Sequence, residues 1–438
     1  MNEANHSITD QEIHVGTVLA PRVDPDPALT PTALDRLVFD RGFPLTAPGV
    51  ATFAFRGDVE SVRLVHFGIG LPDDLAFERI DDSNWWLLAL ALPEGTRLEY
   101  QIEIVEHGHH RTECDPLNPF TARNPFGQNS VCRSHGYAVP PWALHDPEAE
   151  TGSRRSLTIP SAALDWAVPV TLYLPAGFSM EPEHRYPLLI VHDGSDYLHH
   201  AAAATVLDNL IHRGLVPEFV VAFCDPLRDR LVEYSDDERH AAFIVDELVP
   251  YLESHLPLIG DRDARCLGGA SFGALATLST AARHPDVFGR LMLQSGSFAG
   301  ASGECIEPVD DLWSPVYDFV RRFTAEPTAV ADKVFMSCGV FEPMITENRA
   351  IRPILKDTGM QVVMGEALDG HTWGCWRDLL GVALPWLFAD SFRPREPRPF
   401  EPPVTDEPAP PVGAPWPAPD GGPEAPVRAL FIDEEGHG

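Results

Sequence analysis

A serine flanked by glycines is the first feature of this sequence that indicates chemistry. Residues 268–275 read GGASFGAL, so Ser271 stands at the centre of a Gly-x-Ser-x-Gly pattern. In a strained turn from a strand into a helix, this pattern exposes the serine Oγ, and the two glycines leave room for the turn. The apolar stretch ARCL precedes it and SFGALATLSTAARHP follows, which is typical of a strand and then a helix. The pattern therefore predicts a nucleophilic serine at the start of a helix.

A serine nucleophile needs a base, and an acid that orients the base. Of the 18 histidines, His371 lies just after a predicted strand, in ALDGHTWGCW, and before the final helix. The chain order serine, acid, histidine requires a carboxylate between the two. Glu342, in GVFEPMITENRA, falls where the preceding strand ends. Glu347 is the alternative, although a helix beginning just before it would point it elsewhere, and Asp369 lies on the histidine's own loop.

The negative charge that forms on a reacting carbonyl oxygen needs backbone N–H donors. The N–H of Phe272, at the start of the helix, is the first donor that we predict. A second donor is expected from the loop after the third predicted strand of the catalytic region. That loop reads VHDGSDY, and the N–H of Gly194 or of Ser195 is the candidate.

The elements that must position these residues occupy residues 150–391. Eight segments there are predicted strands, and several are continuously apolar, as strands buried on both faces are: SLTIPS, PVTLYLP, YPLLIVHDG, EFVVAFCD, ARCLGG, RLMLQSG, KVFMSCG and QVVMGEAL. Helical patterns fall between the later strands, at 200–213, 238–254, 273–284, 312–323, 345–357 and 376–389. This alternation predicts an α/β fold, a mostly parallel sheet with helices on both faces.

The remaining sequence divides into three further parts. Residues 46–135 alternate apolar and polar positions in short runs, which predicts a small β-sandwich. Residues 1–45 are an N-terminal extension with one short helical pattern, PTALDRLVFDRG. Residues 392–438 are rich in proline and are predicted to be disordered.

Composition excludes several classes of partner. The net charge of −33, from 65 acidic and 32 basic residues, argues against nucleic acid and anionic membranes, because both need a basic surface. No apolar run reaches about 18 residues, and the start, MNEANHSITDQEIH, is polar and acidic. We expect a cytoplasmic protein whose partner is a small-molecule ester. Its oligomeric state stays open.

No metal or other cofactor is expected. The seven cysteines are scattered and form no Cys-x-x-Cys pair, and Cys224, Cys266 and Cys338 lie in apolar runs typical of a core. The histidine-rich stretch EHGHH, residues 106–110, is predicted to be a solvated hairpin turn rather than a metal site.

The motifs together resemble the enterochelin (ferric enterobactin) esterase family, within the wider group of esterase D-like and feruloyl-type esterases. The matching stretches are LLIVHDG, GGASFGALATLSTAARHPDVFGRLMLQSGSF, GVFEPMITENRA, DGHTWGCWRDLL and, in the first half, DPLNPFTARNP. The resemblance implies an α/β-hydrolase fold preceded by an early-set, immunoglobulin-like β-sandwich, and a serine esterase acting on siderophore ester bonds. It implies the roles of nucleophile, base and acid for Ser271, His371 and Glu342, with a serine–histidine pair alone as another possibility. The stretch DPLRDRLVEY resembles a family segment near the site, which implies that Arg230 and Glu233 orient substrate or brace the loop.

Two features leave the substrate open. A ferric catecholate siderophore is an anion, yet this acidic chain offers only a few arginines near the site, Arg228, Arg230, Arg239 and Arg377. Early-set sandwiches also resemble glycogen-binding modules, and one ring of the pair Trp85–Trp86 is a candidate for stacking on a sugar. The alternatives are therefore a carbohydrate ester hydrolase and a non-catalytic carbohydrate-binding protein. We expect the sandwich to shape the substrate site rather than to bind a separate polymer.

Overall fold

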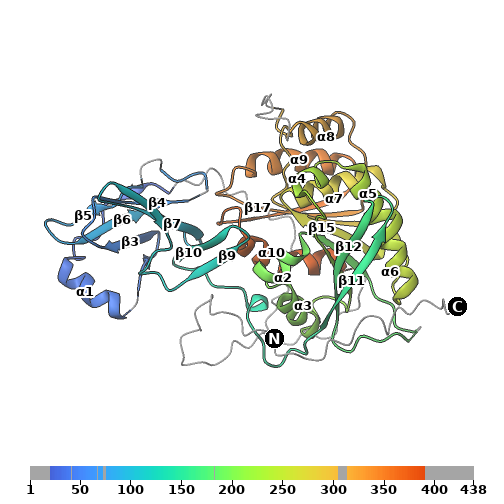
Figure 1. Ribbon diagram of the computed structural model, residues 1–438, viewed down its shortest axis with the longest axis horizontal. Coiled ribbons are helices and arrows are strands. Elements are labelled where there is room, and N and C mark those ends of the chain that lie inside the picture. Colours follow the sequence, from blue (N-terminus) through green and yellow to red (C-terminus); the bar gives the residue numbers. More distant parts are fainter. Residues whose placement is uncertain are drawn as a thin grey trace, which may run out of the picture.

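The computed structural model describes residues 20–40, 42–66, 68–72, 75–181, 183–303 and 313–389. Two five-stranded antiparallel sheets occupy the first part of the chain, and one eight-stranded sheet with its helices occupies the second. Figure 1 shows the two parts side by side, with the first part in blue and teal. The proline-rich segment 392–438 lies outside the described residues.

The large sheet contains all eight strands expected from the sequence. Its strands are β11 (Ser153–Ser161), β12 (Trp166–Leu174), β13 (Leu188–His192), β14 (Val220–Cys224), β15 (Arg265–Ala270), β16 (Arg290–Gln294), β17 (Lys333–Gly339) and β18 (Gln361–Ala367). Their order is β11-β12-β14-β13-β15-β16-β17-β18. The β11–β12 and β12–β14 pairs are antiparallel, and every pair from β14 to β18 is parallel. This is the expected α/β-hydrolase arrangement, in which the active site lies at the carboxyl ends of the parallel strands.

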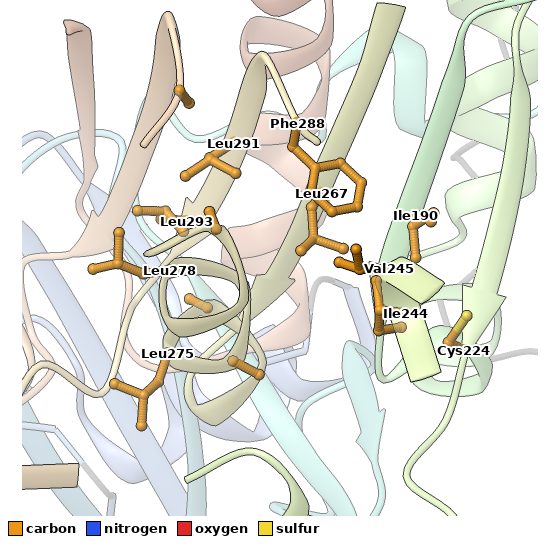
Figure 2. Packing of buried hydrophobic residues seen from close by; sticks show 14 of the residues in the cluster. Ile190, Cys224, Ile244, Val245, Leu267, Leu275, Leu278, Phe288, Leu291 and Leu293 are labelled. Carbon is orange, nitrogen blue, oxygen red and sulfur yellow. The ribbon is translucent and has the colours of Figure 1, made fainter. Parts of the chain in front are cut away.

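Helices cover both faces of this sheet, because its central strands are apolar on both sides. The helices on one face are α2 (Gly194–His200), α3 (Ala203–His212) and α10 (Trp373–Phe388). Those on the other are α5 (Glu238–Ala242), the π-helical turn η2 (Phe243–Leu248), α6 (Val249–His255), α7 (Phe272–Arg283), α8 (Ser314–Ala325) and α9 (Ile345–Asp357). In Figure 2, Leu278 of α7 lies beside Leu293 of β16, and Leu275 and Leu291 belong to the same core, which anchors α7.

Helix α10 begins three residues earlier than its apolar pattern indicated, at Trp373 instead of residue 376. The reason is a cap: the Thr372 hydroxyl accepts a hydrogen bond from the N–H of Cys375 at 3.0 Å. The histidine at 371 therefore stands immediately before the capping residue of a buried helix, and the cap helps to fix its place.

The N-terminal part is a sandwich of two antiparallel sheets. One has the order β1-β6-β3-β2 with β5 beside β6, and the other has β4-β7-β10-β9 with β8 beside β7. These elements are β1 (Arg22–Val23), α1 (Pro31–Asp40), β2 (Leu45–Ala47), β3 (Val50–Arg56), β4 (Ser61–Val65), β5 (Glu78–Arg79), β6 (Trp85–Leu90), β7 (Arg97–Glu106), β8 (His109–Glu113), β9 (Thr121–Asn124) and β10 (Gly127–Arg133). Side chains of both sheets meet in one core. The immunoglobulin-like assignment and the domain boundaries stay predictions.

The idea that Trp85 or Trp86 stacks on a sugar is wrong. The two rings lie on opposite faces of β6, and both are buried, 1% and 7% exposed. Trp86 belongs to the sandwich core. The Trp85 ring packs with Leu34 of α1, and its indole N–H donates to Asp35 of the same helix at 3.2 Å. Helix α1 covers the outer face of the sheet, which a pattern confined to β6 does not reveal.

The histidine-rich stretch forms the turn between β7 and β8, with His109 and His110 exposed. Among the described residues, no helix is long and apolar enough to cross a membrane.

Candidate active site

Ser271 lies between β15 and α7 in a conformation that non-glycine residues rarely adopt. Its backbone has φ 58° and ψ −121°, and such strain is typical of functional turns. The flanking glycines are required by packing. A Cβ on Gly269 would come within 2.7 Å of the carbonyl oxygen of Gly273, and one on Gly273 would come within 3.1 Å of the His192 Cβ. The turn therefore has the geometry that the Gly-x-Ser-x-Gly pattern predicted.

Glu342 and His371 meet from two separate loops. The Nδ1 of His371 is hydrogen-bonded to Oε2 of Glu342. Oε1 of Glu342 accepts two further hydrogen bonds, from the Ser295 hydroxyl and from the Gly339 N–H, both at 2.6 Å. Glu342 is fully buried. Burial alone would raise its pKa, but the interaction with His371 and these hydrogen bonds hold the pKa below its ordinary value. The carboxylate is therefore ionised and fixed against the imidazole.

The imidazole is held so that one nitrogen remains for chemistry. The ring of His371 packs edge-on against Trp376 of α10, with ring centres 5.0 Å apart at 86°, while Glu342 engages Nδ1. This leaves Nε2 as the basic nitrogen. The Ser271 Oγ lies 3.4 Å from the Ser297 Oγ, and among the described contacts it makes no hydrogen bond to His371. Such bonds often tighten only when substrate binds.

Of the two residues predicted for the second oxyanion donor, only Gly194 keeps its N–H available. The N–H and the hydroxyl of Ser195 both donate to Asp225 Oδ1 at 2.9 Å. This commitment argues against Ser195 as the donor. Gly194 and Phe272 are the first residues of α2 and α7, so their N–H groups have no partner within their helices. A Cβ on Gly194 would overlap Phe223, 2.4 Å away, which explains the glycine.

Arg230 and Glu233, at the two ends of α4 (Arg230–Glu233), brace the loop beside the site. The Arg230 guanidinium makes two hydrogen bonds to Asp193, both at 2.7 Å. Glu233 accepts hydrogen bonds from the backbone N–H of Leu227 at 2.8 Å and of Arg228 at 2.6 Å. Both side chains are thus engaged within the protein, which fits loop bracing better than direct contact with a substrate.

A buried histidine pair lies behind the turn of the serine. His192, the last residue of β13, and His240 of α5 share a hydrogen bond between their Nε2 atoms at 3.0 Å. Nδ1 of His192 lies 3.2 Å from the carbonyl oxygen of Gly268 on β15. Burial lowers the pKa of His240 to about 4 and holds the pKa of His192 well below its ordinary value. Both rings therefore stay neutral and serve as structural hydrogen-bonding groups.

Sequence reasoning missed the contacts of three residues that hold this site together, Ser295, Asp369 and Arg97. Ser295, with φ 47°, accepts a hydrogen bond from the indole N–H of Trp376 at 2.8 Å and donates to Glu342. Asp369 does not serve as the acid but binds Arg97 of the N-terminal part. The turn residue Ser295 could have been suspected from the SGS run after β16, whereas no motif marks Arg97.

Comparison with known proteins places the chain among esterases. Residues 161–387 match the family model described as "Putative esterase". An iron(III) enterobactin esterase of Dickeya dadantii (strain 3937) is 30% identical over 48% of this chain and 49% of its own length. An acetyl esterase of Caldicellulosiruptor saccharolyticus is 22% identical over 44% of this chain and 82% of its own length. The chain spans about half the length of the curated enterobactin esterases that it matches.

Solved structures extend the likeness to the N-terminal part. The enterobactin esterase of Shigella flexneri, crystallised in the presence of enterobactin, has a TM-score of 0.64 and covers 78% of this chain and 94% of its own. The two sequences are 20% identical. The shared property is the fold, an α/β-hydrolase domain preceded by a β-rich region.

Proposed function

We propose, since the chain belongs to the esterase family, that it hydrolyses carboxylic esters through an acyl-enzyme on Ser271. The observation that carries the proposal is the pairing of a buried, ionised Glu342 with His371. This pair lies beyond the carboxyl ends of the strands, where the strained turn at Ser271 also lies. A serine, a histidine and an acid arranged on these three loops are the parts that acyl transfer needs.

In the proposed mechanism, the Oγ of Ser271 attacks the ester carbonyl carbon while His371 Nε2 takes the Ser271 hydroxyl proton. The N–H groups of Phe272 and Gly194 receive the oxyanion of the tetrahedral intermediate, supported by the N-terminal end of α7. His371 then gives the proton to the departing alcohol, and the acyl group stays on Ser271. A water molecule, activated by the same imidazole, releases the acid and restores the serine. Glu342 holds the Nδ1 proton in place throughout and stabilises the imidazolium.

A fluorophosphonate probe tests the nucleophile directly. Incubation followed by peptide mass spectrometry should place the label on Ser271, and Ser271→Ala should abolish both labelling and ester turnover. Ser297→Ala is the matched control, because Ser297 is a buried serine close to the nucleophile. This variant should still be labelled on Ser271 and should keep most of the wild-type rate. Active protein that is labelled on Ser297, or not at all, would refute the assignment.

For the substrate, we propose a siderophore-type ester as the first choice. Support comes from relatives named for enterobactin and from a β-rich N-terminal part shared with their structures. Arg230 contributes no spare positive charge, because Asp193 neutralises it. A simple or carbohydrate acetyl ester is therefore the alternative, and the acetyl esterase relative favours it. Turnover of a ferric catecholate siderophore, p-nitrophenyl acetate and a feruloyl ester, compared by kcat/KM, distinguishes these choices. A cytoplasmic location and the immunoglobulin-like class of the sandwich stay predictions.

A further inference from the structure

We propose that Arg97, on the first strand position of β7 in the N-terminal sandwich, is a positioning residue for His371. This inference rests on the proposed function, since it concerns the base of that reaction. It assigns to the N-terminal part a role in catalysis itself, in addition to any contact with a large substrate.

The contacts of Arg97 converge on the loop that carries the histidine. Its Nη1 donates to both carboxylate oxygens of Asp369, at 3.3 and 3.1 Å, and to the Thr372 hydroxyl at 2.9 Å. Its Nη2 donates to Glu99 at 2.7 Å. Its backbone N–H donates to the carbonyl oxygen of Leu368 at 2.9 Å. Arg97 thus binds residues on both sides of His371 in sequence.

The carboxylate that Arg97 engages also shapes the loop internally. Asp369 Oδ1 accepts hydrogen bonds from the Gly370 N–H at 2.7 Å and from the Thr372 hydroxyl at 3.1 Å. Thr372 in turn caps α10. Arg97 and Asp369 are 4% and 3% exposed. Removing one member of such a buried pair leaves the other charge without compensation, so the loop would rearrange or Asp369 would take up a proton.

Gly374 provides a second, independent sign that the position of Arg97 matters. A Cβ on this helical glycine would lie 2.2 Å from Arg97 Cζ and 2.5 Å from both terminal nitrogens. Glycine within a helix is less stabilising than alanine. Gly374 therefore lowers the stability of the first turn of α10, at the place where the Arg97 guanidinium lies.

This arrangement changes one expectation about the N-terminal part. A sandwich that only lined the substrate cleft would be dispensable for a short ester such as p-nitrophenyl acetate. With Arg97 holding the histidine loop, loss of this one side chain should slow even the smallest ester, since a misplacement of about 1 Å can reduce a rate 10²-fold.

The test compares Arg97→Met, Arg97→Lys and Gly374→Ala with the wild type on p-nitrophenyl acetate. For Arg97→Met we expect kcat to fall about 10- to 100-fold with KM changed little, and fluorophosphonate labelling of Ser271 to slow in parallel. Arg97→Lys should recover part of kcat, because it keeps the charge but cannot make all the hydrogen bonds. Gly374→Ala should lower kcat by displacing Arg97, and in Arg97→Met/Gly374→Ala the second change should add no further loss.

Arg265→Met is the matched control. Arg265 binds Glu253 at 2.6 Å in a partly buried pair, but it begins β15, at the end of the strand opposite Ser271. This variant should lose stability and keep kcat. Melting temperatures are measured for all variants, and if Arg97→Met does not fold, the other substitutions decide. Wild-type kcat in folded Arg97→Met, or additive losses in the double variant, would overturn the inference. Absence of ester turnover in the wild type would instead refute the proposed function.

Discussion

Replacing Glu342 by glutamine tests the electrostatics of the site most sharply, because it changes one atom in a buried position. The carboxylate has no solvent to replace its partners, and its Oε1 is held by the Gly339 N–H and the Ser295 hydroxyl, each at 2.6 Å. The backbone N–H of Gly339 cannot become an acceptor, so the glutamine carbonyl oxygen must face it. The amide NH₂ then faces His371 Nδ1.

The consequence for His371 follows from that orientation. An NH₂ group opposite Nδ1 requires this nitrogen to accept, so the ring proton moves to Nε2 and the base is lost. The imidazolium of the transition state also loses its buried counter-charge. Together these effects should lower kcat for p-nitrophenyl acetate by about 10²- to 10⁴-fold. At about 1.4 kcal/mol for each factor of ten, this is about 3 to 6 kcal/mol of transition-state stabilisation.

Steady-state kinetics of Glu342→Gln should be compared with those of Glu347→Gln, at equal folded concentration judged by thermal unfolding. Glu347 is also largely buried, but its two oxygens accept from the N–H and the hydroxyl of Ser302, both at 2.8 Å. Its replacement should leave kcat within a few-fold, because both of its oxygens bind Ser302 rather than the histidine. A large loss in Glu347→Gln would refute the assignment of the acid. Near-normal kcat in both variants would mean that serine and histidine act without an acid.

Three further outcomes are expected. His371→Ala should reduce kcat as much as Ser271→Ala, because members of one catalytic unit are not additive; a tenfold or greater gap between the two would contradict shared action. The free energy of unfolding should fall as pH drops from 6.5 toward 4, because the unfolded chain then binds a proton at His240 that the folded chain, with a pKa of about 4, does not. Urea unfolding at several pH values gives the free energy of unfolding as a function of pH. In His240→Gln this free energy should change with pH less steeply than in the wild type, by about 1.4 kcal/mol per pH unit, and equal pH dependence would contradict the reasoning. Trp85→Ala should destabilise the N-terminal sandwich by about 3–5 kcal/mol, measured by denaturant unfolding, and a loss under about 1 kcal/mol would contradict the described packing beneath α1.

The fold and the loops of the candidate site were predictable because their signals are local. Each parallel strand is a short apolar run, and the residues of chemical interest follow these runs in the sequence. Because the carboxyl ends of parallel strands lie at one edge of the sheet, the fold class alone predicts that these residues meet there. Ser271, Glu342 and His371 are all of this kind. The hydrogen bonds from Ser195 to Asp225 were not predictable. The two residues lie on the turns after two different strands, and a contact between side chains of separate turns leaves no pattern in a single sequence.

Other features depend on contacts between distant segments. Helix α1 covers Trp85 on the outer face of the sheet. The apolar pattern of this short helix predicts that it is a helix but not which face of the sheet it packs against. Arg97 and Asp369 are 272 positions apart, and an arginine at a strand end resembles any exposed charge until the strand's neighbour is known. Apolar periodicity does not predict such pairs, even where the motifs around them are clear.

The distance along the chain between Arg97 and Asp369 also bears on the order of events during synthesis. The N-terminal sandwich leaves the ribosome first and can form its own core, because domains generally fold as units from the N-terminus. At that stage Arg97 can bind Glu99 on the same strand. The histidine loop is made much later, after β18 and just ahead of α10, when Arg97 is already in place. A nascent chain can therefore form the contact between Arg97 and the histidine loop only after the strands of the large sheet have been produced.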